Sequence, residues 1–436
     1  MTGLIMAAQL ILGLSILVLL HEFGHFIMAR AFGIKVEKFY LFFDAWGFKL
    51  FKFTYKGTEY GMGWLPLGGY VKIAGMIDES VDKEQMKLPQ QPWEFRSKPA
   101  WQRLFVMLGG VTVNLILGVI LFAMVILVYE KDFVPNSAIT GISPYELGEK
   151  AGFQEGDKIL EINGKKVVRF KDAISMAIIF GADVTVERAG QKQIIHIDEN
   201  FYDEFKQSNI KTLYEPYLGA VIVDSIVPDR PAALAGMKKG DLIVSINDSI
   251  QIVSYPQFIK EIKSLRNTEI LLTSIRKEDT LTQTLQIDSL GIGMNRLISE
   301  LPTENYSLTQ AVYYGWKDAM EMLKLNITGI GKIFKGKEKA SDSLQGPIGI
   351  AKIYGGVWDW HKFWYITGLL SLVLAFMNIL PIPALDGGHV LFLLIEVITG
   401  RKLSDKFMEN VQYIGMLILM ALMIFVIGND IFRLFK

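Results

Sequence analysis

The residues best suited to chemistry lie near the start of the chain, in the run His21-Glu22-Phe23-Gly24-His25. Two histidines four positions apart share one face of a helix, so both imidazoles can bind the same metal ion. The glutamate beside the first histidine can reach a metal-bound water and take its proton. This spacing predicts a zinc ion held by His21 and His25, with Glu22 as a general base.

A hydrolytic zinc site needs a third protein ligand and an open position for water. The chain has 5 histidines and no cysteine, so the candidates are few. Asp386 and His389 follow two prolines in a segment where a helix is interrupted, and Gly387 and Gly388 are expected to extend that interruption. Asp386 is the expected ligand, because it would otherwise be an unpaired carboxylate in lipid. His389 is the alternative, expected instead to be a hydrogen-bond partner.

The composition indicates that these residues are positioned by a membrane protein. Of 436 residues, 51% are hydrophobic, and the mean hydropathy is +0.30. A net charge of zero argues against a nucleic-acid partner. Spanning a bilayer takes about 20 helical residues. Four segments qualify: Leu4–Arg30, Val106–Val128, Phe363–Leu380 and Val411–Ile427. Val390–Ile398 is too short to span and is expected to be re-entrant or interfacial.

Lysine and arginine residues near the span ends predict the orientation of the chain. They follow the first span, precede the second, and lie between the third and fourth: Arg30, Lys35, Lys38, Lys98, Arg103, Arg401, Lys402 and Lys406. These regions are expected in the cytoplasm, which places both termini and the segment from Tyr129 to Trp360 outside. His21 follows Leu4 by about 26 Å of helix, so the zinc is expected near the cytoplasmic face.

The outer segment contains an internal repeat. Ala151-Gly-Phe-Gln-Glu-Gly-Asp157 recurs 84 residues later as Ala235-Gly-Met-Lys-Lys-Gly-Asp241. Each copy leads into an alternating strand, a polar turn and a helical stretch. The pattern resembles the PDZ domain, which binds peptides by adding a strand to a sheet edge. The two modules are expected to bind peptides, or to be rigid spacers with no ligand. For control of the protease, they could exclude substrates with bulky outer domains or, alternatively, capture peptides.

Two further segments bear on the site. Strand-forming residues begin near Val36, and Gly61–Ile73 is expected to form a hairpin on the cytoplasmic side, near the depth of the zinc. A free strand edge there could hold an unwound peptide through main-chain hydrogen bonds, or the hairpin could simply plug the bundle. The segment Leu308–Phe334 intersperses aromatic and charged residues, as in a helix on a membrane surface or a plain soluble helix.

Together these motifs resemble the site-2 protease family of intramembrane zinc metalloproteases, and its bacterial RseP-like members in particular. The similarity covers the chain from end to end and rests on His21–His25, Leu65–Lys72, the tandem outer modules, Gly346–Ala351 and Asn378–Gly388. One motif departs from the family pattern. The second span often carries Gly-Pro-x-x-Asn, whereas here Gly110 is followed by valine, with Asn114 in place.

The resemblance implies roles for individual residues. The three ligands and the base predicted above match those of the family. Asn378 matches a residue implicated in substrate binding. The segment that contains Gly68, Gly69, Tyr70 and Val71 matches a membrane-associated β element that presents substrate.

The resemblance also implies an activity and its partners. Family members cleave transmembrane segments of single-pass proteins, such as anti-sigma-factor-like proteins and remnant signal peptides, after another protease has removed the outer domain. We expect a zinc endopeptidase in a bacterial inner membrane, with the PDZ-like modules on the periplasmic side and the lipid bilayer as a further partner. The alternative is a non-catalytic PDZ-type scaffold with a structural zinc, for which a closed four-ligand site would be typical.

The predicted fold is a polytopic α-helical membrane protein with four transmembrane helices, a membrane-associated β-hairpin or sheet, and two tandem PDZ-like α+β domains inserted between helices 2 and 3. The predicted divisions are 1–35 (first helix with the metal motif), 36–100 (β region), 101–129 (second helix), 130–215 and 216–292 (PDZ-like domains), 293–361 (amphipathic linker), 362–400 (third helix with the aspartate motif) and 401–436 (fourth helix).

Overall fold

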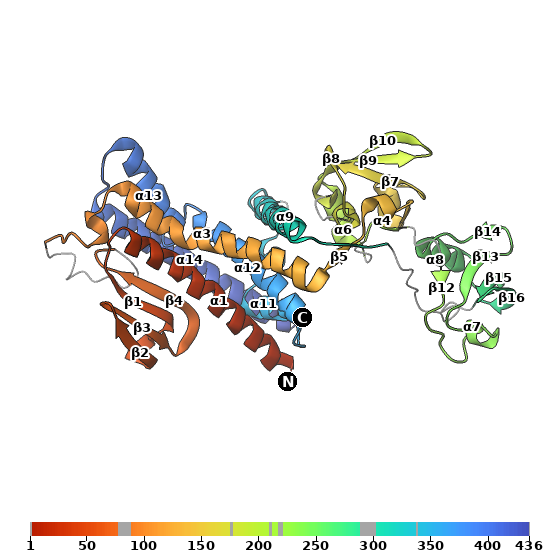
Figure 1. The fold of residues 1–436 in the computed structure, drawn as a ribbon, viewed down its shortest axis with the longest axis horizontal. Coiled ribbons are helices and arrows are strands. Elements are labelled where there is room, and N and C mark those ends of the chain that lie inside the picture. Colours follow the sequence, from red (N-terminus) through yellow and green to blue (C-terminus); the bar gives the residue numbers. More distant parts are fainter. Residues whose placement is uncertain are drawn as a thin grey trace. The chain divides into compact units, whose positions relative to one another are not determined.

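The computed structural model describes residues 2–76, 89–174, 178–208, 212–216, 221–287, 302–336 and 339–435. The chain divides into two compact units: a helical unit built from Met1–Glu130 and Ser307–Lys436, and an inserted unit, Lys131–Tyr306 (Figure 1). Because the helical unit is made from both ends of the chain, it can bring the first helix and the last third of the sequence together.

Four helices in the described part of the chain are long and apolar enough to cross a bilayer. They are α1 (Thr2–Ala31), α3 (Ala100–Val125, continued by a π-helical turn, Ile126–Glu130), α12 (Trp360–Ile379) and α14 (Asp405–Leu434). Each predicted span falls on one of them. Helices α12 and α14 begin earlier than the predicted spans. The side chains of Asp359 and Ser404 cap them by accepting hydrogen bonds from backbone N–H groups of their first turns.

Helix α3 lies at the centre of the helical unit and packs against α1, α12, α13 (Asp386–Thr399) and α9 (Leu308–Phe334). Gly24 of α1 and Gly109 of α3 bring the two backbones into contact, because a Cβ on either would overlap the carbonyl of the other. Such small-residue contacts let helices approach closely inside a membrane. The segment His21–His25 of α1 is therefore in direct contact with α3.

Helix α9 has the bounds predicted from its amphipathic pattern. It begins with a capping box in which Ser307 and Gln310 satisfy each other's backbone N–H groups. Gly315 allows it to pack against α3 beside Ala123. Its position at a membrane surface stays a prediction.

Helix α13 has 14 residues, so the predicted short apolar stretch is indeed too short to span. The prediction that Gly387 and Gly388 extend the interruption was wrong. They form the first turn of α13, and the break is confined to Leu380–Leu385. Glycine is needed at both positions because the returning chain passes close by: an added Cβ would overlap the carbonyl oxygen of Leu380 or lie 2.7 Å from that of Ile382.

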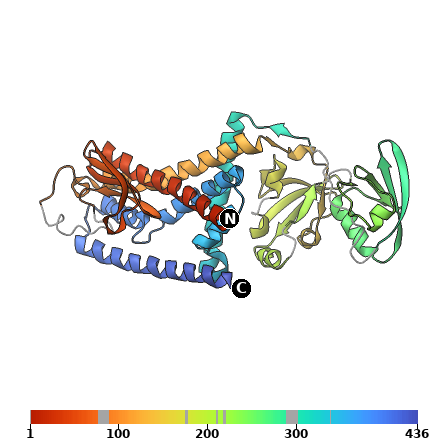
Figure 2. The same cartoon turned by 90° about the horizontal axis from the view of Figure 1, so that it is seen from below.

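The motif Gly346–Ala351 forms the start of α11 (Pro347–Tyr354), after the short helix α10 (Ala340–Ser343). The buried carboxylate of Asp430, on α14, accepts hydrogen bonds from the backbone N–H groups of Gly346, Ile348 and Gly349 at 2.9 to 3.1 Å. These are the N–H groups that a helix start leaves without internal partners. Asp430 thus joins α14 (blue in Figure 2) to the rest of the helical unit.

Residues 36–73 form a four-stranded sheet with the order β2-β3-β1-β4. The strands are β1 (Val36–Phe43), β2 (Lys49–Tyr55), β3 (Thr58–Gly63) and β4 (Leu65–Ile73). The predicted hairpin within Gly61–Ile73 was wrong, because β1 lies between β3 and β4 and pairs with both. Only Trp64 separates β3 from β4, which is too few residues for a hairpin turn. Strand β4 is an edge of the sheet and packs against α1 (Figure 1).

The inserted unit contains the two sequence repeats, each around its own apolar core. The first comprises β6 (Ile142–Pro144), α4 (Glu146–Lys150), β7 (Lys158–Ile162), β8 (Lys165–Lys166), α5 (Phe170–Ala173), β9 (Ala182–Arg188), β10 (Gln191–Ile197), α6 (Phe201–Gln207) and β11 (Tyr214–Pro216). The second comprises β12 (Val221–Ile222), α7 (Pro231–Leu234), β13 (Leu242–Ile246), β14 (Ile250–Gln251), α8 (Tyr255–Ser264), β15 (Glu269–Arg276) and β16 (Asp279–Gln286).

The sheet of the first repeat has the order β10-β9-β7-β8, with β11-β6 as a separate pair, and that of the second has β12-β13-β15-β16 with β14 on β13. A short pair, β5 (Asp132–Phe133) with β17 (Glu304–Asn305), lies where the chain enters and leaves the unit. The predicted boundary of the second domain at residue 292 falls outside the described residues.

Each repeat is held by the same buried ion pair. Asp157 accepts two hydrogen bonds from Arg188 at 2.7 Å, and Asp241 accepts two from Arg276 at 2.6 and 2.8 Å. Both carboxylates are fully buried. Burial alone would raise the pKa of Asp241, but the hydrogen bonds from Arg276 and from the Lys238 backbone outweigh burial and hold the pKa below its usual value. The final aspartate of the repeat is therefore a structural anchor.

We expect Arg276→Met to destabilise the second repeat by about 3 kcal/mol, because it leaves the Asp241 carboxylate buried without its partner. Amides of β13 and β15 in the whole protein should exchange hydrogen about 100-fold faster, while the first repeat keeps its protection. Lys239→Met, which removes an exposed pair with Asp224, is the matched control. In the unaltered protein, protection of the second repeat should fall as the pH drops through the lowered pKa of Asp241. Unchanged exchange in Arg276→Met would contradict the anchor role.

Candidate metal centre

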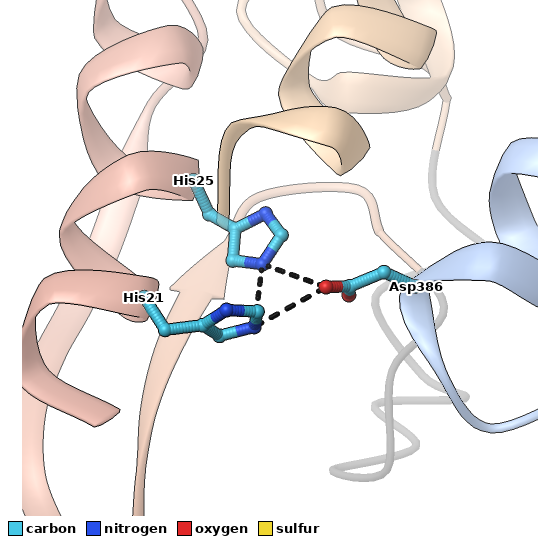
Figure 3. Close-up of side chains that lie close together, drawn as sticks. All are labelled: His21, His25 and Asp386. Carbon is cyan, nitrogen blue, oxygen red and sulfur yellow. Dashed lines mark hydrogen bonds and ion pairs between the residues drawn. The ribbon is translucent and has the colours of Figure 1, made fainter. Parts of the chain in front are cut away.

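Three side chains that can bind a metal ion lie close together in the helical unit. The first of them, His21, and the last, Asp386, are 365 positions apart in the sequence. His21 and His25 project from successive turns of α1, and Asp386 projects from the first residue of α13 (Figure 3). Oδ2 of Asp386 lies 3.2 Å from Nε2 of His21 and 3.3 Å from Nε2 of His25, and the two Nε2 atoms lie 3.2 Å apart.

This triangle has the size that a zinc ion requires. Ligand atoms about 2.0 Å from a tetrahedral zinc lie about 3.3 Å from one another. The Asp386 Oδ2 atom is also buried without a hydrogen-bond partner. Three electron-pair donors that point at one place need a cation between them, so the residues present fit zinc.

The described residues supply three ligand atoms to this cluster. His389, the alternative ligand, is absent from the group and lines a different cavity with Phe392 and Arg103. His196 pairs with Asp183 in the first repeat, and His361 stacks on Tyr129. A three-ligand set leaves the fourth tetrahedral position for water or substrate.

Groups on α3 orient both imidazoles through contacts with their Nδ1 atoms. Nδ1 of His25 lies 2.9 Å from the Val106 carbonyl oxygen, which fixes Nδ1 as the protonated nitrogen and Nε2 as the free one. Nδ1 of His21 lies 3.2 Å from the side-chain amide of Asn114. The Asn114 Oδ1 atom is buried without a partner. Exchanging the two amide atoms brings Oδ1 to Nδ1 of His21, so that both histidines donate from Nδ1 to an oxygen on α3.

The space for the imidazoles is made by Gly110 of α3. A Cβ at this position would lie 2.5 Å from Nε2 of His25 and 2.6 Å from Cε1 of His21. Sequence reasoning saw Gly110 and Asn114 only as a family motif. Their spacing of four residues, which places both on one helical face toward α1, is the signal that could have identified them as supports of the metal motif.

The remaining predicted site residues lie around this cluster. Glu22 is half-buried, and its carboxylate lies close enough to the two histidines, Asp386 and the backbone N–H of Val71, on β4, to interact with them. Gly69 of β4 packs close to α1. The amide nitrogen of Asn378, on α12, lies 3.4 Å from Nε2 of His21. The tertiary structure therefore gathers residues from α1, β4, α12 and α13 at one site.

Gly68 and Tyr70 complete the predicted set on β4. The Tyr70 hydroxyl donates a hydrogen bond to Asp44, and its ring stacks between Tyr40 and Phe43. This side chain therefore belongs to the packing of the sheet. The part of β4 that is available to interact at the metal cluster is therefore its backbone.

Comparison with known sequences agrees with this geometry. The sequence model of Peptidase family M50 matches residues 9–422. The chain belongs to peptidase family M50. Members of this family are intramembrane zinc proteases, so the chain is a zinc-dependent protease, and the scaffold alternative is set aside.

Named relatives match along almost the whole chain. Protease RseP of Yersinia pestis is 29% identical, and the regulator of sigma-E protease RseP of Escherichia coli is 28% identical; each comparison covers 98% of both chains. A Vibrio cholerae protein named as a zinc metalloprotease is 30% identical over 97% of this chain and 98% of its own length. The RseP-like resemblance predicted from the motifs is thus confirmed.

We expect Asn114→Leu to weaken zinc binding by about 10- to 100-fold, because His21 loses the acceptor that orients its ring. Zinc affinity is measured by competition with a chelator on the purified protein. Asn114→Asp, which keeps an oxygen at the same place, should restore most of the affinity. Gln9→Leu removes another fully buried amide from the membrane helices and is the matched control. Equal zinc affinity in Asn114→Leu and the unaltered protein would refute this role.

Proposed function

We propose that His21, His25 and Asp386 hold the zinc ion of this protease and that Glu22 is its general base. The observation that carries the proposal is the triangle of ligand atoms with edges of 3.2, 3.2 and 3.3 Å, which closes around one position between α1 and α13. Glu22 lies beside this triangle without being part of it.

A zinc ion held by His21, His25 and Asp386 would supply Lewis acidity for the scissile carbonyl and for the attacking water. The residues of the chain do the remaining work. The Glu22 carboxylate accepts the proton of the attacking water and then returns it to the nitrogen of the leaving amine. We assign substrate binding to Asn378, whose amide nitrogen lies 3.4 Å from Nε2 of His21 and can hold a polar group of the substrate.

Strand β4 is the proposed docking site of the substrate. The peptide bonds of a transmembrane helix are shielded, so the substrate must unwind before it is cut. An unwound segment can add to the β4 edge through main-chain hydrogen bonds, with Gly68, Gly69, Tyr70 and Val71 supplying the backbone. Because Val71 lies near Glu22, a segment held on β4 would lie next to the base.

The proposed substrates are transmembrane segments of single-pass membrane proteins from which another protease has removed the outer domain, such as anti-sigma-factor-like proteins and remnant signal peptides. The relatives named as regulators of sigma-E support this class. The proposed location is the inner membrane of a bacterium, with the two PDZ-like repeats on the periplasmic side, as the distribution of lysine and arginine indicates.

Glu22→Gln should abolish peptide-bond cleavage while the protein keeps about one zinc per chain, because the amide cannot accept the proton of water. His21→Ala, His25→Ala and Asp386→Ala should each lower the zinc content as well. Zinc is measured by elemental analysis of purified protein, and cleavage with a trimmed single-pass substrate. Full zinc content in Asp386→Ala would refute Asp386 as the third ligand. Substantial turnover by Glu22→Gln would mean that another residue is the base.

The orientation can be checked with single cysteines, because the chain has none of its own. Lys263→Cys, on an exposed face of the second repeat, should react with a membrane-impermeant maleimide in intact cells. Arg401→Cys, between α13 and α14, should react only after lysis. The reverse labelling pattern would place the repeats in the cytoplasm.

A further inference from the structure

The edge of β6 in the first repeat is already paired with a strand from the same chain. On one side, the Ile142 backbone exchanges hydrogen bonds with the turn Gly156-Asp157, at 2.9 Å each. On the other side, β11 runs antiparallel to β6, with Tyr214 opposite Pro144 and Glu215 opposite Ser143. Strand β11 belongs to the connection that leads from the first repeat to the second.

In a PDZ-like module, a peptide ligand would bind at the position of β6. In the second repeat, Val223 makes the same two hydrogen bonds, with Asp241 and Gly240, that Ile142 makes with Asp157 and Gly156. Modules that bind peptides by strand addition receive an extended chain along a sheet edge, where backbone hydrogen bonds hold it and a side-chain pocket selects it. Strand β11 meets both requirements.

Tyr214 fills the side-chain pocket. Only 1% of its surface is exposed, and its ring packs edge-on against Phe153 with centroids 4.8 Å apart. Its hydroxyl donates a hydrogen bond to the Ala173 carbonyl, at the end of α5. The backbone is held as well, since the Tyr145 N–H donates to the Leu213 carbonyl at 2.8 Å. The segment is therefore anchored like a bound peptide with a buried aromatic residue.

A glycine makes room for this segment. A Cβ at Gly148, on α4, would overlap the carbonyl of Leu213. At the offset of 84 that aligns the two repeats, the second repeat has alanine, Ala232. The first repeat thus carries a local adaptation for the close approach of residues 212–216.

We propose that the first repeat is a peptide-binding module closed by its own chain, and that an extended peptide with an aromatic residue binds along β6 only by displacing Tyr214. A tethered segment competes at an effective concentration on the order of millimolar, so a free peptide of equal intrinsic affinity is excluded at micromolar concentration. Displacement would also free the connection that joins the repeats, so peptide binding would change the linkage between them.

A disulfide provides the first test, on the full-length protein in detergent. Ser143 and Glu215 are directly opposed across an antiparallel pair, at a separation that a disulfide spans. Ser143→Cys with Glu215→Cys should form a bond on oxidation, whereas neither single variant can form it within one chain. Failure of the paired variant to cross-link would overturn the proposal, because it would place the segment away from β6.

Peptide binding provides the second test, by fluorescence anisotropy with the labelled peptide Thr-Leu-Tyr-Glu-Pro, which copies residues 212–216. Tyr214→Ala should bind it at least ten-fold more tightly than the unaltered protein. Gly148→Ala should show no such gain, because its Cβ would overlap the leucine carbonyl of the peptide as it overlaps that of Leu213. The peptide with alanine in place of tyrosine should not bind. The oxidised double-cysteine protein should not bind the tyrosine peptide, and reduction should return its affinity to that of the unaltered protein. Equal binding by the oxidised double-cysteine protein and by Tyr214→Ala, or no gain in Tyr214→Ala, would refute self-closure.

Discussion

The structure of the helical unit depends on one constraint: a metal site inside an apolar bundle must leave no polar group of its ligands without a partner. Unpaired polar atoms are costly where water is excluded. Here each histidine turns its Nε2 toward Asp386 and the proposed metal position, and its Nδ1 toward an oxygen-bearing group on α3, Val106 for His25 and Asn114 for His21. Asp386 supplies the negative charge that two neutral imidazoles lack. The bundle is arranged so that these groups meet.

Glycine makes that arrangement possible. Gly24 and Gly109 let α1 and α3 touch at their backbones, and Gly110 leaves the volume that the two imidazoles occupy. Gly387 and Gly388 let α13 start immediately after the chain has turned back on itself, which aims Asp386 at α1. Apolar attraction between helices is weak in lipid, so close packing of small residues has to hold such a site together.

The inserted unit is built differently, as two small domains, each with its own apolar core and one buried Asp–Arg pair. Their shared Asp–Arg network explains why the repeat is visible in the sequence. Their differences matter more for function. In the first repeat, β6 is paired with β11 and Gly148 admits the strand, whereas the aligned residue of the second repeat is alanine. A module closed in this way favours exclusion of substrates over capture of peptides in its resting state.

The sequence by itself determined the elements whose signal is local: the four apolar helices, the bounds of α9, the repeat, and the histidine pair, because a spacing of four residues on a helix fixes both positions. It also singled out Asp386 by the cost of a lone carboxylate in lipid. Only the tertiary structure decided what depends on distant partners. Strand β1 lies between β3 and β4, and Asn114 and Val106 orient the histidines, since pairing and hydrogen bonding between remote segments leave no periodic trace in the chain.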